Sequence, residues 1–134
     1  MNVLFVCTGN TCRSPMAQAI YQSITGEEAR SGGLGVNEAQ PVSPLALAAL
    51  ESLGIPGFTH LSRQVTPEDM AWADKIYVMT QLHRSILAAV CPDAADRILL
   101  LGGDRDISDP FGGDLEVYTA CCREIEQCIR ERCL

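Results

Sequence analysis

The chain opens with an uninterrupted apolar run, Val3-Leu4-Phe5-Val6, and the nine residues from Cys7 to Pro15 follow it directly. Ser14-Pro15 is typical of a helix start, because proline is well tolerated in the first helical turn. Gly9 and Asn10 tolerate the left-handed backbone of a tight turn. The N-terminus is therefore predicted to be a buried strand that turns into a helix through one short loop.

The rest of the chain alternates in the same way between short apolar runs and helical patterns. Strands are predicted at 2–6, 28–31, 76–79 and 98–101. Helices are predicted at 14–25, from Ser43-Pro44 to the residue before Gly54, from Thr66 through Trp72, at 81–90 and at 114–133. This alternation predicts an α/β fold of one domain over residues 1–134. The predicted architecture has three layers, α/β/α, and the middle layer is a four-stranded parallel sheet of doubly wound, flavodoxin-like topology.

The predicted helix 81–90 has a regular apolar spacing. Leu82, Ile86 and Val90 recur every four residues, which predicts that they face the core, and His83 is then expected to be exposed. Ligands of doubly wound sheets bind beyond the carboxyl ends of the strands, where Cys7 lies.

Composition limits the classes of partner. The 134 residues carry a formal charge of −7 and are 47% hydrophobic, which argues against binding to a nucleic-acid backbone or an anionic membrane. No signal peptide and no apolar stretch of about 18 residues is found. Seven cysteines in a chain of this size indicate a reducing, cytoplasmic setting. No Cys-x-x-Cys pair faces a second such pair or a histidine pair, so a zinc site is not expected. The C-terminal thiols are instead expected to pack in the core: Cys121, Cys122, Cys128 and Cys133.

The loop after the first strand carries the chemistry. Its backbone N–H groups and the helix dipole can hold a tetrahedral oxyanion, and Arg13 adds a planar set of donors. The same electrostatic field is expected to lower the pKa of Cys7, whose thiolate is the attacking form. The loop therefore indicates a cysteine-dependent phosphatase. It lacks the Gly-Lys-Ser/Thr ending of a nucleotide-binding P-loop.

A second chemical element, Ser108-Asp109-Pro110-Phe111-Gly112-Gly113, follows the fourth predicted strand. Asp109 can approach the Cys7 loop from that sheet edge and serve first as general acid and then as general base. The alternative is that this segment is only a turn. Three nearby carboxylates compete for the same role: Asp104, Asp106 and Asp114.

These residues together resemble the low-molecular-weight protein tyrosine phosphatase family over essentially the whole chain. The resemblance implies that Cys7 is the nucleophile, Arg13 the phosphate clamp and Asp109 the general acid, with no cofactor and no metal. It also implies a phosphate-binding loop with these members: Thr8, Gly9, Asn10, Thr11, Cys12, Arg13 and Ser14. In the family, the counterpart of Asn10 shapes the loop and that of Ser14 supports the thiolate, while Ser31 and His60 resemble residues that brace the asparagine. Cys12 resembles a second thiol that can form a reversible disulfide.

Within the family, three details are closer to bacterial protein arginine phosphatases. Thr11 stands where tyrosine phosphatases usually have an aliphatic residue, Gly112-Gly113 follows Phe111 where they commonly have a second aromatic, and Met79-Thr80 replaces Met-Asp. We therefore expect a monomeric enzyme that hydrolyses phosphoarginine on a protein substrate, with Thr11 and Phe111 setting specificity.

Three alternatives stay open. The first is a tyrosine phosphatase, because loops 33–42 and 102–107 are short and form the rim of the pocket. The second is an arsenate reductase-like enzyme, for which Cys91 resembles one redox cysteine, although the segment 80–90 holds no partner thiol. The third is a non-catalytic phosphate-binding module.

Overall fold

A computed structural model describes residues 1–134 and contains one four-stranded sheet. The strands are β1 (Val3–Cys7), β2 (Arg30–Gly33), β3 (Lys75–Val78) and β4 (Ile98–Leu100). All neighbouring pairs are parallel and the strand order is β2-β1-β3-β4. In this register Phe5 of β1 lies opposite Ser31 and Tyr77. The predicted α/β fold with a four-stranded parallel sheet is confirmed.

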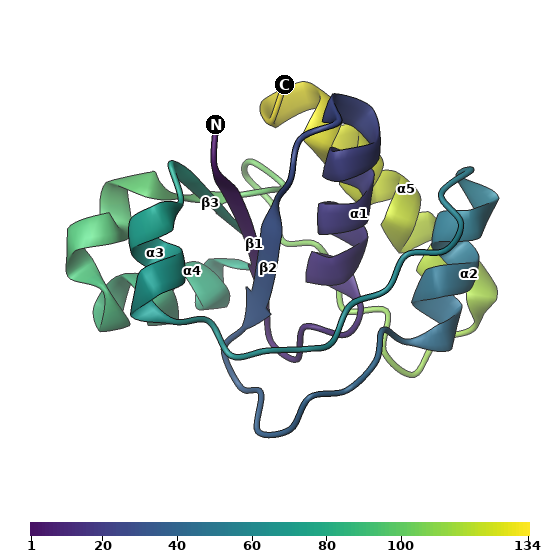
Figure 1. The fold of residues 1–134 in the computed structure, drawn as a ribbon, viewed down its shortest axis with the longest axis horizontal. Helices are drawn as coiled ribbons and strands as arrows, with labels where there is room; N and C mark the ends of the chain where they lie inside the picture. The colour runs from purple at the N-terminus through teal and green to yellow at the C-terminus, as the bar shows by residue number, and fades with distance from the viewer.

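Helices cover both faces of the sheet (Figure 1). One layer contains α1 (Arg13–Thr25), α2 (Pro44–Ser52) and α5 (Leu115–Arg132). The other contains α3 (Pro67–Trp72), α4 (Gln81–Val90) and a 3₁₀ helix, η1 (Pro92–Arg97). The predicted elements begin and end within about two residues of these bounds, whereas η1 was not predicted. No helix is long and apolar enough to cross a membrane.

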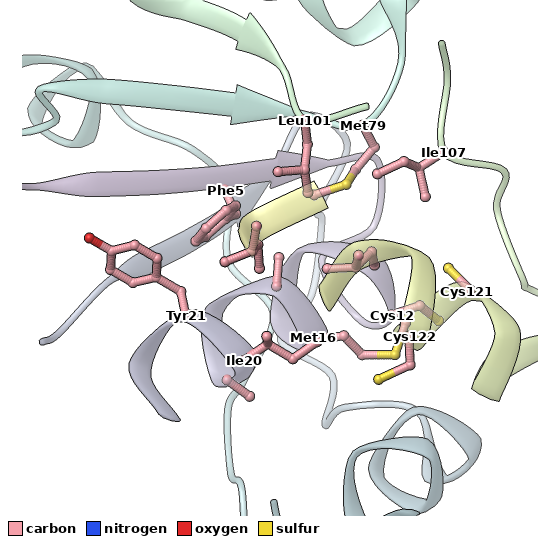
Figure 2. Packing of buried hydrophobic residues seen from close by; sticks show 14 of the residues in the cluster. Phe5, Cys12, Met16, Ile20, Tyr21, Met79, Leu101, Ile107, Cys121 and Cys122 are labelled. Atoms are coloured by element: carbon pink, nitrogen blue, oxygen red, sulfur yellow. The ribbon is translucent and has the colours of Figure 1, made fainter. Parts of the chain in front are cut away.

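The core lies on the two faces of β1. Val3, Phe5 and Cys7 belong to the cluster beneath α1, α2 and α5, while Leu4 and Val6 belong to the cluster on the opposite face. This alternation is the two-residue period of a strand that is buried on both sides. Figure 2 shows the larger cluster, to which Cys12, Cys121 and Cys122 belong together with Met16 and Ile20. The predicted packing role of the C-terminal thiols is confirmed, with Cys133 only partly buried.

Helix α4 is rotated relative to the prediction. Leu82, Ile86 and Val90 are 67%, 41% and 76% exposed, whereas His83 and Leu87 are buried. The expectation of an inward apolar stripe and an exposed His83 was therefore wrong. Contacts with distant segments hold this rotation, because Leu87 packs in the core and Nε2 of His83 lies 2.8 Å from the Thr8 hydroxyl.

Two of the predicted helix starts differ in how they are capped. Thr66 forms a complete capping box with Asp69 at the start of α3. Ser43 is the N-cap of α2 but its side chain makes no capping bond. Its backbone N–H instead donates to the carbonyl of Thr11 at 2.9 Å. The start of α2 is thereby tied to the loop that follows β1.

Candidate active site

The loop between β1 and α1 forms the floor of a pocket of about 250 Å³ at the carboxyl edge of the sheet. The backbone N–H groups of Gly9, Thr11 and Cys12 donate to no protein acceptor. Cys12 is the N-cap of α1 and makes no side-chain capping bond, so the positive end of the helix dipole is left for a ligand. The lining comprises Cys7 to Arg13 together with Asp109 and Phe111. Such a floor suits a tetrahedral anion.

Cys7 is 3% exposed, with its sulfur held by two polar neighbours. The Ser14 hydroxyl lies 2.9 Å from Sγ, and the backbone N–H of Asn10 donates to Sγ at 3.3 Å. Burial nevertheless raises the pKa of the Cys7 thiol, and this outweighs the opposing effects of Ser14, Arg13 and Asn10. The expected lowering of this pKa was wrong for the free site, because burial destabilises the thiolate more than its polar neighbours stabilise it.

Asn10 gives the loop its shape. Its φ of 56° makes it the only non-glycine residue in the left-handed region. The side-chain amide donates to the Ser14 hydroxyl at 2.7 Å and to that of Ser31 at 3.1 Å. Its carbonyl oxygen accepts from Nε2 of His60 at 2.8 Å and from the backbone N–H of Arg63 at 3.0 Å. All the hydrogen-bonding capacity of this buried amide is therefore used.

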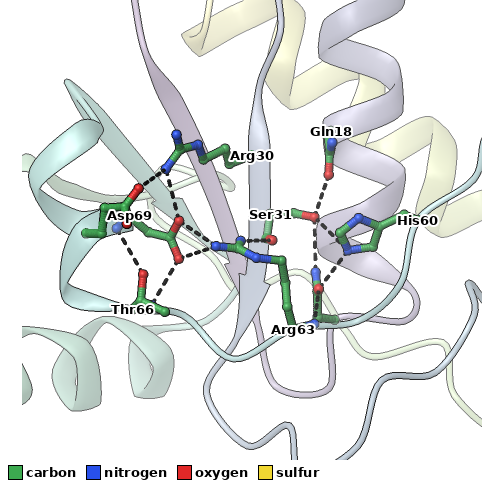
Figure 3. A network of polar contacts seen from close by, with 9 residues as sticks. Gln18, Arg30, Ser31, His60, Arg63, Thr66 and Asp69 are labelled. Atoms are coloured by element: carbon green, nitrogen blue, oxygen red, sulfur yellow. Dashed lines mark hydrogen bonds and ion pairs between the residues drawn. The ribbon is translucent and has the colours of Figure 1, made fainter.

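The bracing network continues away from the pocket (Figure 3). Ser31 donates to Gln18 Oε1 at 2.6 Å, and the Arg63 guanidinium donates to the Ser31 carbonyl at 2.8 Å. Arg63 also contacts both carboxylate oxygens of Asp69. Although burial alone raises the pKa of Asp69, its bonds with Arg63 and Thr66 lower that pKa overall. Burial and the nearby Arg63 lower the pKa of His60.

The structure brings Ser31 and His60 to Asn10 as the resemblance implied. Sequence reasoning missed Arg63 and Asp69. The only available signal was the capping pattern that begins at Thr66.

Arg13 and Asp109 meet at the mouth of the pocket. The buried Arg13 guanidinium donates to the carbonyl of Ile107 at 2.8 Å, which aims its other terminal nitrogen toward Asp109, 3.6 Å away. The Asp109 side chain is 53% exposed, and its other oxygen accepts from the backbone N–H of Phe111 at 3.1 Å. A carboxylate thus lies beside the anion site with one oxygen held and the other facing the pocket.

The three competing carboxylates have other positions. Asp106 accepts from the backbone N–H of Gln81 at 2.8 Å, at the start of α4. Asp114 is the N-cap of α5 and accepts from Val117 at 3.0 Å. Asp104 is exposed and does not line the pocket. Asp109 is therefore the only carboxylate in the pocket lining.

The predicted specificity residues form the wall and rim. The nearest side-chain polar atom that Thr11 Oγ1 contacts is Cys12 Sγ, at the long distance of 3.8 Å, so the Thr11 hydroxyl is available to a ligand. Phe111 lines the pocket while 80% of its surface is exposed. Gly112 follows with a φ of 87°, which lets the segment turn sharply behind the aromatic ring.

Two further residues have polar contacts near the loop. Cys12 Sγ lies 3.5 Å from the Tyr118 hydroxyl. His83, which sequence reasoning placed at the surface, is buried with Nε2 2.8 Å from the Thr8 hydroxyl.

Cys91 packs on the other face of the sheet and does not line the pocket. No group of three or more potential metal ligands is present.

This fold and pocket define a class of protein. The family model for low molecular weight phosphotyrosine protein phosphatase matches residues 2–132. The chain belongs to this family and is a phosphatase of it.

Similarity to individual proteins is also high. A protein-arginine-phosphatase from Geobacillus stearothermophilus is 40% identical over 95% of this chain and 90% of its own length. The low molecular weight protein-tyrosine-phosphatase PtpB of Staphylococcus epidermidis is 34% identical, over 88% of this chain and 86% of its own. A solved YwlE arginine phosphatase, a mutant whose active-site serine replaces cysteine and is phosphorylated, superposes with a TM-score of 0.89. It is 35% identical over 98% of this chain and 93% of its own.

Proposed function

We propose that the protein is a protein arginine phosphatase that acts through a phosphocysteine intermediate. The substrate is a phosphorylated protein whose phosphoryl group enters the pocket above the loop Thr8–Ser14. The unpaired N–H groups of the loop and the buried Arg13 bind the phosphoryl oxygens. Support for the mechanism comes from the solved relative whose active-site serine, in place of cysteine, carries a phosphoryl group.

In the first step, the bound phosphoryl dianion takes the thiol proton of Cys7, and the thiolate attacks phosphorus, so that an S–P bond forms and the P–N bond to the guanidinium breaks. Ser14 stabilises the thiolate by donating its hydroxyl hydrogen across the 2.9 Å contact. Asp109 gives a proton to the departing nitrogen, and the arginine side chain leaves. Asp109 suits this role because it lines the same pocket as Cys7, with the oxygen that does not accept from Phe111 lying 3.6 Å from Arg13.

In the second step, the Asp109 carboxylate takes a proton from a water molecule whose oxygen attacks phosphorus. The S–P bond breaks, its electron pair returns to Cys7 as thiolate, and inorganic phosphate is released. Asp109 regains the proton that it lost, so one residue serves both halves of the reaction. Arg13 holds the phosphoryl oxygens throughout.

The observation that carries the choice of arginine is the Thr11 hydroxyl, which lines the pocket without a good hydrogen-bond partner. A guanidinium leaving group brings N–H donors into the pocket, and a threonine oxygen can accept one of them. An aliphatic residue at this position would leave such a donor unpaired, at a cost of about 1–3 kcal/mol. A phenol ring makes no such demand on the pocket wall.

The test is the ratio of kcat/KM for phosphoarginine and phosphotyrosine peptides of matched sequence. We expect the wild-type enzyme to prefer phosphoarginine and Thr11→Ile to shift the ratio toward phosphotyrosine by roughly 10- to 100-fold. Thr11→Ser keeps the hydroxyl and serves as the matched control. A phosphotyrosine preference in the wild type that Thr11→Ile leaves unchanged would overturn the choice of arginine and favour a tyrosine phosphatase.

A further inference from the structure

One buried polar atom near the pocket has no partner. His83 is 4% exposed, and its Nδ1 makes no hydrogen bond. Its other ring nitrogen, Nε2, lies 2.8 Å from the hydroxyl oxygen of Thr8, the residue that follows Cys7. His83 lies in the first turn of α4, where its backbone N–H donates to the Thr80 hydroxyl at 3.1 Å, and the contact with Thr8 shows that its ring projects toward the loop.

The unpartnered Nδ1 decides which way the bond to Thr8 runs. A neutral imidazole has one N–H and one lone pair. If Nδ1 carried the hydrogen, a buried N–H donor would be unsatisfied, which is rare in folded proteins. Burial and, to a smaller extent, the neighbouring Arg13 lower the pKa of His83 to about 4, so the ring is neutral near pH 7. The groups that oppose this effect are Asp106 and Asp109.

We propose that His83 is a positioning residue that donates from Nε2–H to the Thr8 hydroxyl oxygen and thereby directs the hydroxyl hydrogen of Thr8 into the pocket. Thr8 lines the pocket and makes no other side-chain hydrogen bond. Once its oxygen accepts from His83, its own hydrogen is free to donate to a phosphoryl oxygen. The loop thus gains a side-chain donor beside the nucleophile, in addition to its backbone N–H groups.

This inference rests on the phosphatase chemistry proposed above but not on the choice of arginine. The test therefore uses para-nitrophenyl phosphate as substrate and vanadate as a phosphate-like inhibitor. The variants are Thr8→Val, His83→Leu and the double variant, with Thr8→Ser and His83→Gln as conservative replacements. Leu87→Ala is the matched control for loss of packing, because Leu87 is buried one turn further along α4.

We expect Thr8→Val to lower kcat/KM and weaken vanadate inhibition by roughly 10- to 100-fold, the usual value of a hydrogen bond to a charged group. His83→Leu should weaken both to a similar degree, and the double variant should be no worse than Thr8→Val. Thr8→Ser and His83→Gln should restore most of the loss. Leu87→Ala should lower the unfolding midpoint without changing vanadate inhibition.

The proposal would be overturned if the fold-losses of the two single variants multiplied in the double variant. Vanadate inhibition of a folded His83→Leu protein as strong as that of the wild type would also overturn it. A second measurement on the wild type does not depend on any variant folding. Imidazole ¹⁵N chemical shifts at pH 7 should show the hydrogen of His83 on Nε2, and a hydrogen on Nδ1 would overturn the proposal. A preference for phosphotyrosine would overturn the arginine assignment and leave these outcomes unchanged.

Discussion

On one side of the phosphate loop, the Asn10 amide makes four hydrogen bonds, to Ser14, Ser31, His60 and Arg63. On the other side, Thr8 makes a single side-chain bond, to a histidine whose second ring nitrogen is unpaired. Asp109 and Phe111, which complete the pocket, are largely exposed. The first side is fully satisfied by the protein, whereas the second leaves hydrogen-bonding capacity free.

This difference matches the different demands that the phosphoryl group and the leaving group make on the pocket. A phosphoryl group has the same geometry in every substrate, so the floor that binds it gains from being held in one shape. The leaving group must be bound, protonated and released, and the residues that meet it are held by fewer contacts. The braced side is expected to keep the phosphoryl-binding floor in one shape, whereas Asp109 and Phe111 on the open side are expected to meet the leaving group.

The largest effects should follow from changes at the centre of the loop. We expect Cys7→Ser to lower turnover by about 10⁴-fold or more while the protein still binds phosphate, because Arg13 and the backbone donors are intact. Arg13→Lys should lose roughly 10²–10³-fold, since an ammonium cannot make the bidentate contact. Steady-state kinetics and phosphate titration by calorimetry measure both. Substantial turnover by Cys7→Ser would refute the mechanism.

The next effect in size concerns the open side. Asp109→Asn should slow hydrolysis by roughly 10²–10⁴-fold, the usual range for a positioned acid or base. Activated aryl phosphates should suffer least in the first step, because their leaving groups need no proton. Burst kinetics with para-nitrophenyl phosphate separate the two steps. Asp106→Asn is the control, and near-wild-type rates for Asp109→Asn on every substrate would move the acid role to a neighbouring carboxylate.

The two sides also differ in how far they could be predicted from the sequence. Cys7, Arg13 and Asp109 follow strands whose carboxyl ends meet, so their proximity was predictable from the alternation of elements. The rotation of α4 was not, because its spacing of Leu82, Ile86 and Val90 is that of an ordinary buried stripe. The rotation depends on contacts between distant segments, such as the bond from His83 to Thr8.

The raised pKa of Cys7 could not be predicted for a related reason. The donors around its sulfur are adjacent in sequence, but its burial depends on helices and strands from the whole chain. Spacing shows which groups are near one another, whereas it does not show how much water is excluded from them.

A smaller effect is expected on oxidation. Peroxide should oxidise Cys7 to a sulfenic acid through the fraction of thiolate that Ser14, Arg13 and Asn10 stabilise, and the Cys12 thiol then attacks it, so that a disulfide forms and water leaves. Activity should return after treatment with a thiol reductant in the wild type and much less in Cys12→Ser, whose sulfenic acid is oxidised further. Cys91→Ser, on the opposite face, is the control and should recover like the wild type. Equal recovery in all three proteins would make Cys12 a packing residue only.

The smallest expected effect is on the free energy of unfolding, and it comes from His83, whose Nδ1 is unpaired. The pKa of His83 is about 4 in the folded protein against an ordinary value of 6.5. Between these values the unfolded chain binds more protons, so the contribution of His83 is complete above pH 6.5 and is lost as the pH falls toward 4. The loss amounts to at most about 3 kcal/mol.

Urea unfolding of the wild type and His83→Gln at pH 7 and pH 4.5 measures this contribution. The wild type should lose more stability between the two values than the variant, whose glutamine does not titrate. His60 is present in both proteins, so its own lowered pKa cancels in the comparison. Parallel losses in the two proteins would show that His83 is accommodated in its charged form, and the open side of the loop would then tolerate a positive charge beside Arg13.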